Sequence, residues 1–261
     1  MAVDPYAAPK SRVADAPLVA PDGAFIARGR SVAAGNGWTW ITDAWDMFKV
    51  QKGTWMGLFV ILAIIIVVLN VLPGIGPILL IVLSPVLYGG VMLGCEAQRN
   101  GERLEIGHLF AGFRNYTGRL IGVGGAALLG FAGVFVVVML FFGADMARMM
   151  IGTRPTPEQM QAAAMGMLLA PLIILALSLP IYMAVWFASP LIVLNNLGVG
   201  DAMKASFSGC LKNILPSFVF GVAFVLLAIV ATIPLALGWL ALGPVLLASI
   251  YTGYRDIYYE R

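Results

Sequence analysis

Charged side chains are scarce in this chain. They make up only 11% of its 261 residues, whereas 61% are hydrophobic, and the mean hydropathy is +0.93. Soluble globular chains carry roughly 25% charged residues. Because so few polar side chains cannot cover a water-exposed surface, the composition excludes an ordinary soluble domain and favours one compact membrane bundle.

Cysteine and histidine are also nearly absent. Two cysteines, Cys95 and Cys210, are too few for a disulfide framework, and a cytoplasmic position at helix ends would keep them as thiols. The single histidine, His108, has Glu105 three residues before it, which is half of one di-iron ligand set. Zinc sites need three or four ligands. We therefore expect neither a metal ion nor a cofactor.

Groups that perform chemistry are missing from the apolar stretches. The serines there have no neighbouring base to activate them, and no Walker loop occurs. The segment 122–127 fits a loose dinucleotide-binding pattern, but no strand precedes it, so we reject it. The basic residues are too few and dispersed for a nucleic-acid patch. We expect neither an enzyme with catalytic residues nor a nucleic-acid-binding protein.

Ionisable residues, which mark transport paths when they lie deep in a membrane, occur only at the ends of the apolar stretches. Glu96 is the one carboxylate placed slightly inside such an end. We expect it to form a structural ion pair with Arg99, and a coupling role is the alternative. An ion-coupled pump is therefore disfavoured.

What the chain has in abundance is apolar runs long enough to cross a bilayer, which takes about 20 helical residues. Six spans are predicted, at residues 53–72, 77–97, 120–143, 165–193, 215–233 and 235–254. One long kinked helix or a re-entrant pair is the alternative for the last two, but 40 residues from 215 to 254 favour two crossings. The predicted fold class is an all-α polytopic membrane bundle.

The basic residues orient this bundle. Fourteen of the sixteen Lys and Arg residues fall on one side of the six spans, and only Arg148 and Arg154 fall on the other. Cytoplasmic loops carry the excess of basic residues, so both termini are predicted to be cytoplasmic. No apolar core of a signal peptide occurs in residues 1–37. Residues 1–35 are expected to be a disordered tail. The alternative is that this tail contains a short linear docking site.

Three amphipathic segments precede the odd-numbered spans, at residues 36–52, 106–119 and 199–212. Trp38, Ile41, Trp45 and Phe48 recur at helical spacing, as expected for one face of a helix. Such helices can lie in the cytoplasmic membrane interface. The predicted interfacial anchors are Trp38, Trp45, Phe48, Phe113 and Phe207.

Prolines recur in the even-numbered spans. Pro85, Pro180 and Pro244 stand at equivalent places, where neighbouring helices can tolerate a kink. We predict three copies of one repeat, each made of an interfacial helix, a straight span and a kinked span, at about 36–97, 104–193 and 198–258. Together they form a six-span domain of residues 36–258. Chance similarity among apolar segments is the alternative.

Two further patterns concern lipid contact and helix packing. Gly90 and Gly94 form a small-residue pair that lets helices approach closely, within the chain or in a dimer. Aromatic residues at the end of the last span predict a belt at the membrane interface. These residues are Tyr251, Tyr254, Tyr258 and Tyr259.

Three segments carry a family resemblance: GNGWTWI at 35–41, LFAGF at 109–113 and DAMKASF at 201–207. They resemble six-span inner-membrane proteins of Gram-negative bacteria, which are similar to the membrane domain attached to some glycerophosphodiester phosphodiesterases. The resemblance covers roughly residues 35–258. It implies an inner-membrane location and no established activity, because the phosphodiesterase catalytic domain is absent.

These observations predict an envelope assembly, lipid-handling or accessory factor that acts through its interfacial helices. The alternative is a facilitator or channel for a small or amphiphilic solute, with a path lined by the proline-containing spans. The predicted partners are membrane lipids, together with a membrane-protein partner or a second copy of the chain.

Overall fold

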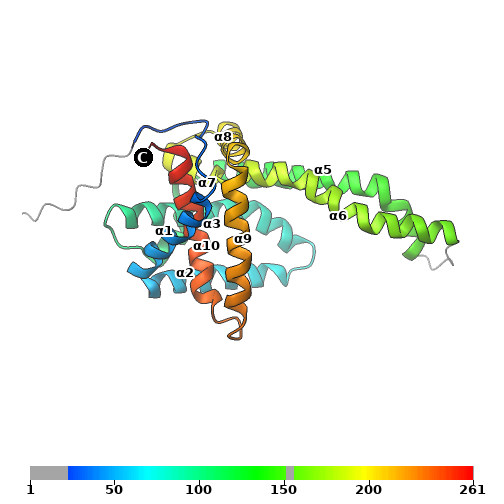
Figure 1. Ribbon diagram of the computed structural model, residues 1–261, viewed down its shortest axis with the longest axis horizontal. Helices are drawn as coiled ribbons and strands as arrows, with labels where there is room; N and C mark the ends of the chain where they lie inside the picture. Colours follow the sequence, from blue (N-terminus) through cyan, green and yellow to red (C-terminus); the bar gives the residue numbers. More distant parts are fainter. Residues whose placement is uncertain (1–22, 151–155, 261) are drawn as a thin grey trace, which may run out of the picture.

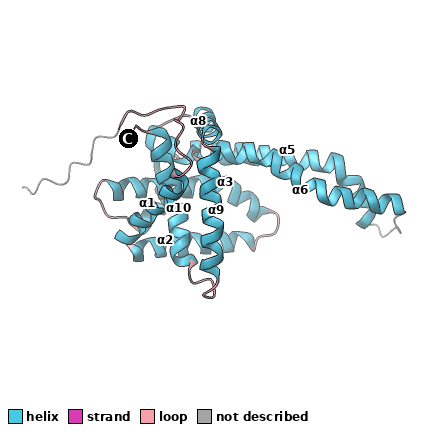
Figure 2. Cartoon of the chain, in the orientation of Figure 1, coloured by secondary structure: helices cyan, strands magenta, loops and turns pink. Residues whose placement is uncertain are grey.

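The computed structural model describes residues 23–150 and 156–260, which fold almost entirely into helices (Figure 2). The helices are α1 (Asn36–Val50), α2 (Lys52–Asn70), α3 (Ile75–Arg99), η1 (Ile106–Phe110), α4 (Gly112–Asn115), α5 (Thr117–Met150), α6 (Pro157–Trp186), α7 (Ala188–Asn195), α8 (Val199–Lys212), α9 (Ile214–Thr232) and α10 (Trp239–Tyr258). In these ranges the β-structure is a single bridge between Phe25 and Tyr259. The predicted all-helical class is confirmed.

Five helical segments are long and apolar enough to cross a membrane: α2, α3, α5, α6 with α7, and α9. They correspond to the first five predicted spans. The sixth, α10, does not reach the same hydropathy, because Thr252, Arg255 and Asp256 occupy its last turns. The structure therefore establishes five candidate spans, one fewer than predicted.

The last two predicted spans are separate helices. Leu235 and Ala236 have φ angles of 52° and 62°, and this left-handed backbone reverses the chain between α9 and α10. The resulting hairpin is visible at the lower edge of Figure 1. The alternative of one long kinked helix is therefore wrong, and the last helix begins at Trp239 rather than at residue 235.

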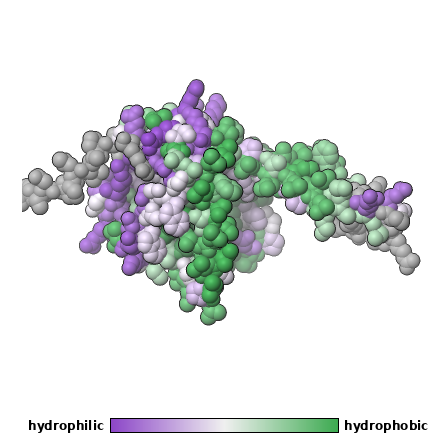
Figure 3. Space-filling view, viewed as in Figure 1, coloured by the Kyte–Doolittle hydropathy of each residue, from purple (hydrophilic) through white to green (hydrophobic). Residues whose placement is uncertain are grey.

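Large apolar side chains cover much of the outer surface. Leu129, Phe135, Leu140 and Phe141 of α5 are exposed, as is Leu226 of α9. Figure 3 shows hydrophobic surface along α9 and along the α5–α6 hairpin, which projects from the other helices in Figure 1. Contiguous apolar surface of this extent requires lipid or a partner to cover it.

The interior is organised around α3 and α10. Met92 of α3 and Tyr251, Tyr254 and Tyr258 of α10 are almost fully buried. α3 packs against α5, α7 and η1, while α10 packs against α1, α2 and α9. The tyrosines therefore face the protein, and the predicted interfacial belt at the end of α10 is wrong.

Span 4 is interrupted near its end by a side chain from another helix. The Ser206 hydroxyl of α8 donates to the Met183 carbonyl at 2.7 Å and accepts from the Phe187 amide at 2.9 Å. A helix would join these two backbone groups directly. A side chain that inserts between a helical amide and its carbonyl acceptor interrupts the helix at that point. α6 therefore ends at Trp186 and α7 begins at Ala188.

The three predicted proline positions all lie inside helices: Pro85 in α3, Pro180 in α6 and Pro244 in α10. Proline cannot donate to the carbonyl four residues earlier. Around Pro85 this is compensated, because the Ser84 hydroxyl lies 3.4 Å from the Ile81 carbonyl. Ser189 of α7 also donates to the Pro85 carbonyl at 3.1 Å.

The three segments predicted as amphipathic helices differ in form. α1 and α8 are single helices, but residues 106–119 form η1, α4 and the first turn of α5. α1 packs on α9 and α10, η1 and α4 pack on α3, and α8 packs on α6 and α7. Gly90 lies against the backbone of η1, where a Cβ would meet the carbonyls of His108 and Leu109. The small-residue pair therefore serves packing within the chain.

Part of the predicted disordered tail is ordered. Residues 23–35 run beside the end of α10, where the Ile26 amide donates to the Tyr258 carbonyl and the Arg30 amide to the Ile257 carbonyl. Asn213 also accepts from the Val32 amide at 2.8 Å. Residues 1–22 lie outside the described residues.

Candidate functional site: a charged cavity between α1, α3 and α10

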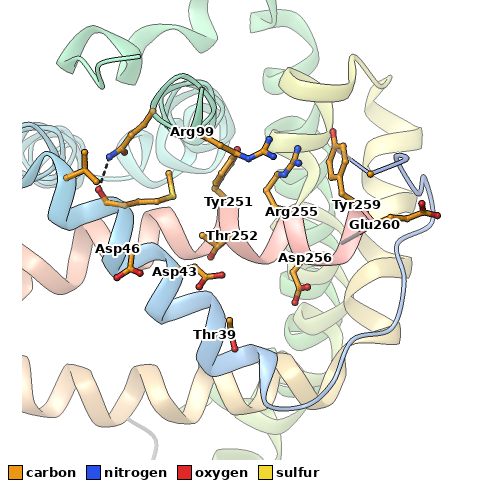
Figure 4. Close-up of a pocket in the computed structure, with 14 residues that line it drawn as sticks. Thr39, Asp43, Asp46, Arg99, Tyr251, Thr252, Arg255, Asp256, Tyr259 and Glu260 are labelled. Carbon is orange, nitrogen blue, oxygen red and sulfur yellow. Dashed lines mark hydrogen bonds between the residues drawn. The ribbon is translucent and has the colours of Figure 1, made fainter. Parts of the chain in front are cut away.

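A cavity of about 910 Å³ opens between α1, the last turn of α3 and the end of α10. Its lining is rich in charged and hydroxyl-bearing side chains, as Figure 4 shows. These include Thr39, Asp43, Asp46, Arg99, Tyr251, Thr252, Arg255, Asp256, Tyr259 and Glu260. Because it brings charged and hydroxyl-bearing side chains from three helices together, we take this cavity as the candidate site.

Asp256 anchors the wall of this cavity. Its carboxylate is buried, and Oδ2 accepts hydrogen bonds from Asn36 Nδ2 at 2.7 Å and from Trp40 Nε1 at 2.9 Å. Oδ1 lies 3.2 Å from Arg30 Nη2, and Arg30 Nε donates to the Asp256 carbonyl at 2.9 Å. A buried carboxylate needs such partners to offset the loss of hydration, so Asp256 fixes α1 and residues 23–35 onto α10.

Glu96 is held in the same way at the end of α3. Arg99 Nη1 lies 3.7 Å from Glu96 Oε1, which is the ion pair predicted from the sequence. The Tyr251 hydroxyl also donates to Glu96 Oε2 at 2.6 Å. This second partner comes from α10, far along the chain, and local sequence offers no signal for it. Glu96 therefore links α3 to α10 as well as to the next turn of α3.

A third polar cluster lies where α7 meets α10. Tyr254 donates to Asn195 Oδ1 at 2.5 Å, and Asn195 Nδ2 donates to the Tyr259 hydroxyl at 2.9 Å. The Arg255 guanidinium stacks 3.8 Å above the centre of the Tyr259 ring. Stacking over an aromatic face favours a guanidinium, so Tyr259 orients Arg255 at the edge of the cavity.

The cavity has a basic side and an acidic side. Figure 4 shows the side chains of Arg99 and Arg255 extending toward one another above Tyr251. Asp43 and Asp46 line the opposite side, on α1. Lys49 pairs with Asp46 at 2.7 Å. The arrangement suits a ligand that carries an anionic and a cationic group.

The predicted interfacial anchors fall into two groups. Trp38, Trp45, Phe113 and Phe207 each expose more than a third of their surface. Phe48 belongs to the hydrophobic core and has only 4% of its surface exposed. The buried face of α1 is formed by Gly37, Trp40, Ile41, Ala44 and Phe48. Trp40, which the sequence pattern did not single out, is the tryptophan of α1 that faces inward.

The two cysteines are enclosed, whereas His108 is partly exposed. Cys95 and Cys210 are buried free thiols, and burial raises the pKa of the Cys210 thiol to about 12. His108 caps η1, where its Nδ1 accepts from the Glu105 amide at 2.9 Å. Among the described residues, no three His, Cys, Asp or Glu side chains are placed to hold a metal ion.

The helices of spanning length and the apolar exterior define a membrane protein with transmembrane helices. The chain is similar to a protein of Burkholderia thailandensis (strain ATCC 700388 / DSM 13276 / CCUG 48851 / CIP 106301 / E264) named "Probable inner membrane protein BTH_II0599". The two are 27% identical over 219 residues, which cover 81% of this chain and 80% of the relative. No family model matches the chain, and no solved structure matches it. These comparisons give no support to the resemblance to phosphodiesterase membrane domains.

Proposed function

We propose that this chain is a multi-pass protein of the bacterial inner membrane with six spans and both termini in the cytoplasm. The name of its relative and the five apolar helices support the location. α10 has 20 residues, about 30 Å of helix, which is the thickness of a bilayer core. Its polar residues face the protein rather than lipid, because Tyr251, Tyr254 and Asp256 are buried.

We also propose that the spans form three structural repeats. Each interfacial segment packs on the hairpin of the preceding copy in a cyclic order: α1 on α9 and α10, η1 and α4 on α3, α8 on α6 and α7. A small residue, Gly94, Ser189 or Gly253, follows each spanning-helix proline at the same distance. Gly94 adjoins Leu104 and His108, and Gly253 adjoins Trp40.

The function that this geometry supports best is lipid handling. In the proposed orientation the charged cavity lies at the cytoplasmic ends of α3 and α10, at the depth of lipid headgroups. The observation that carries the proposal is the meeting of Arg99 and Arg255 in one cavity from two different helices. Guanidinium groups bind phosphate through parallel hydrogen bonds. The protein then holds a phospholipid headgroup in this cavity as an accessory factor of the membrane.

The acidic side of the cavity further limits the kinds of headgroup that we expect it to bind. Asp43 and Asp46 on α1 offer carboxylates to a cation, and an ammonium group donates up to three hydrogen bonds. A headgroup with a phosphate and a primary ammonium fits both sides.

Binding of short-chain lipids to purified protein in detergent tests this proposal. We expect a lipid with an ethanolamine headgroup to bind more tightly than its glycerol counterpart. Arg99→Gln and Arg255→Gln should each weaken binding roughly tenfold or more, the effect of losing a charged hydrogen bond. Arg114→Gln, an exposed arginine away from the cavity, is the matched control.

Equal binding by wild type and both cavity variants would contradict the headgroup site. The facilitator alternative makes a different prediction. Protein in sealed liposomes would then pass a solute, at a rate that changes when Pro85, Pro180 or Pro244 is replaced.

A further inference from the structure

A second cavity lies deeper in the helices. It has a volume of about 350 Å³ and is lined by the middle turns of α3 and α10, the first half of α5, the end of α6 and the start of α7. Ligand pockets in proteins span about 300–1,000 Å³. The charged cavity is lined by the last turns of α3 and α10, so the two cavities occupy different depths along the same two helices.

The lining of this second cavity is apolar and carries no charged residue. Its lining includes Ala127 and Phe131 of α5 and Ile181 and Val185 of α6. α3, α5 and α6 are all among the helices of spanning length, so the cavity lies within the proposed hydrocarbon region. A small ion or a polar solute would find no compensating group there.

Three hydrogen-bond donors in this apolar wall have no partner. Tyr88, Tyr182 and Trp186 line the cavity, and neither the two hydroxyls nor the indole nitrogen bonds to another group in the described part of the chain. The nearby serines are already engaged, Ser84 with the Ile81 carbonyl and Ser189 with the Pro85 carbonyl. A donor left unpaired in a bilayer costs free energy, so these three groups call for an acceptor.

The break between α6 and α7 helps to create this arrangement. Trp186 is the last residue of α6, and Ser189 and Pro190 in the first turn of α7 also line the cavity. The Ser206 hydroxyl separates the two helices, and it therefore also helps to position the residues of this cavity wall.

We propose that this cavity binds the acyl end of an amphiphile, with the chain in the apolar space and a carbonyl or carboxyl oxygen accepting from Tyr88, Tyr182 or Trp186. The proposal rests on the lipid-handling function and names the part of the ligand that this second site holds. The carbonyl oxygen of an ester or of a protonated acid accepts hydrogen bonds, which complements three donors. A phospholipid ester and a free fatty acid share this chemistry.

Photo-crosslinking tests the proposal in full-length protein reconstituted into nanodiscs. Two probes carry the same diazirine-bearing acyl chain, one as a phospholipid ester and one as a free fatty acid. Mass spectrometry should place the adducts on the segments around Tyr88 and Tyr182. The probe with the higher yield identifies the source of the acyl group.

Two kinds of variant make the test specific. Tyr88→Phe and Tyr182→Phe keep the rings and remove the donors, and each should raise the half-saturating probe concentration roughly threefold to tenfold, the effect of one neutral hydrogen bond. Ala127→Leu should fill the cavity and abolish the adducts. Tyr116→Phe, a partly buried tyrosine outside both cavities, is the matched control.

Adducts spread evenly over lipid-facing residues such as Leu129 and Phe135, and unchanged in the two Tyr→Phe variants, would overturn the acyl site. The Tyr→Phe variants decide the matter even if Ala127→Leu does not fold. The fatty-acid probe has no phosphate headgroup, so Arg99→Gln should leave its adducts unchanged. Headgroup binding can therefore fail while acyl binding holds, and the two proposals are tested separately.

Discussion

The indole nitrogen of Trp40 donates a 2.9 Å hydrogen bond to the Asp256 carboxylate, and it joins the first helix of the chain to the last. Asn36 and Arg30 bind the same carboxylate from the segment around α1. The two ends of the fold are therefore held together by one buried acidic residue. Removing a buried charged partner leaves the others unpaired and costs more than removing one donor.

Asp256→Ala should destabilise the protein by about 3 kcal/mol, because three donors lose their acceptor. Trp40→Phe, which removes one donor, should cost about 1 kcal/mol for the hydrogen bond. Thermal unfolding in detergent measures both. Asp46→Ala is the control, since its exposed pair with Lys49 contributes roughly 0.5 kcal/mol. Equal melting temperatures for Asp256→Ala and Asp46→Ala would refute the anchoring role.

Ser206→Ala should weaken the junction between α6 and α7. The Phe187 amide would lose its acceptor in a buried place, at a cost of about 1–3 kcal/mol. The melting temperature and the rate of proteolysis near residue 187 report this loss. Ser208→Ala, on the same helix, removes a more exposed hydrogen bond to the Arg28 carbonyl and should have a smaller effect. A larger effect at Ser208 would show that the junction does not depend on Ser206.

Gly209 and Tyr258 lie in such close contact that a Cβ on Gly209 would overlap the Tyr258 hydroxyl. Gly209→Ala should therefore be destabilising, and Tyr258→Phe should be destabilising because it removes a bond to the Ala205 carbonyl. Since Tyr258→Phe also removes the overlapping atom, the double variant should lose less stability than the two single losses together. Gly35→Ala, where nothing lies within 4 Å, is the control. Strict additivity would contradict the contact.

The proposed orientation can be read with reporter fusions. A reporter that is active only in the periplasm should be active when fused after Thr156, between α5 and α6, and inactive after Gly101, between α3 and η1. The reason is that the positive-inside rule places Arg99 and Arg103 in the cytoplasm. The reverse pattern of activity would invert the orientation and move the charged cavity to the outer leaflet.

Hydropathy located the spans because lipid selects long apolar helices regardless of their neighbours. α2, α3, α5 and α9 all lie where the apolar runs predicted them. The ion pair between Glu96 and Arg99 was also predictable, because residues three apart are neighbours on a helix. Both predictions depend only on local sequence.

The polar interior was not predictable in this way. Asp256, Tyr251 and Tyr254 point inward because α1, α3 and α7 supply their partners, and those partners are remote in sequence. Because lipid-facing and buried faces of a membrane helix are both apolar, composition does not show which face Tyr258 occupies. The break at Phe187 likewise depends on Ser206 from another helix rather than on Pro180.

Native mass spectrometry of protein extracted from its own membranes tests the lipid-handling account most directly. The account predicts a retained phospholipid whose headgroup carries a phosphate and an ammonium group. It also predicts that this lipid is lost from the Arg99→Gln, Arg255→Gln double variant and kept by Arg114→Gln. Wild-type protein without bound lipid, or a double variant that keeps the same lipid, would contradict it.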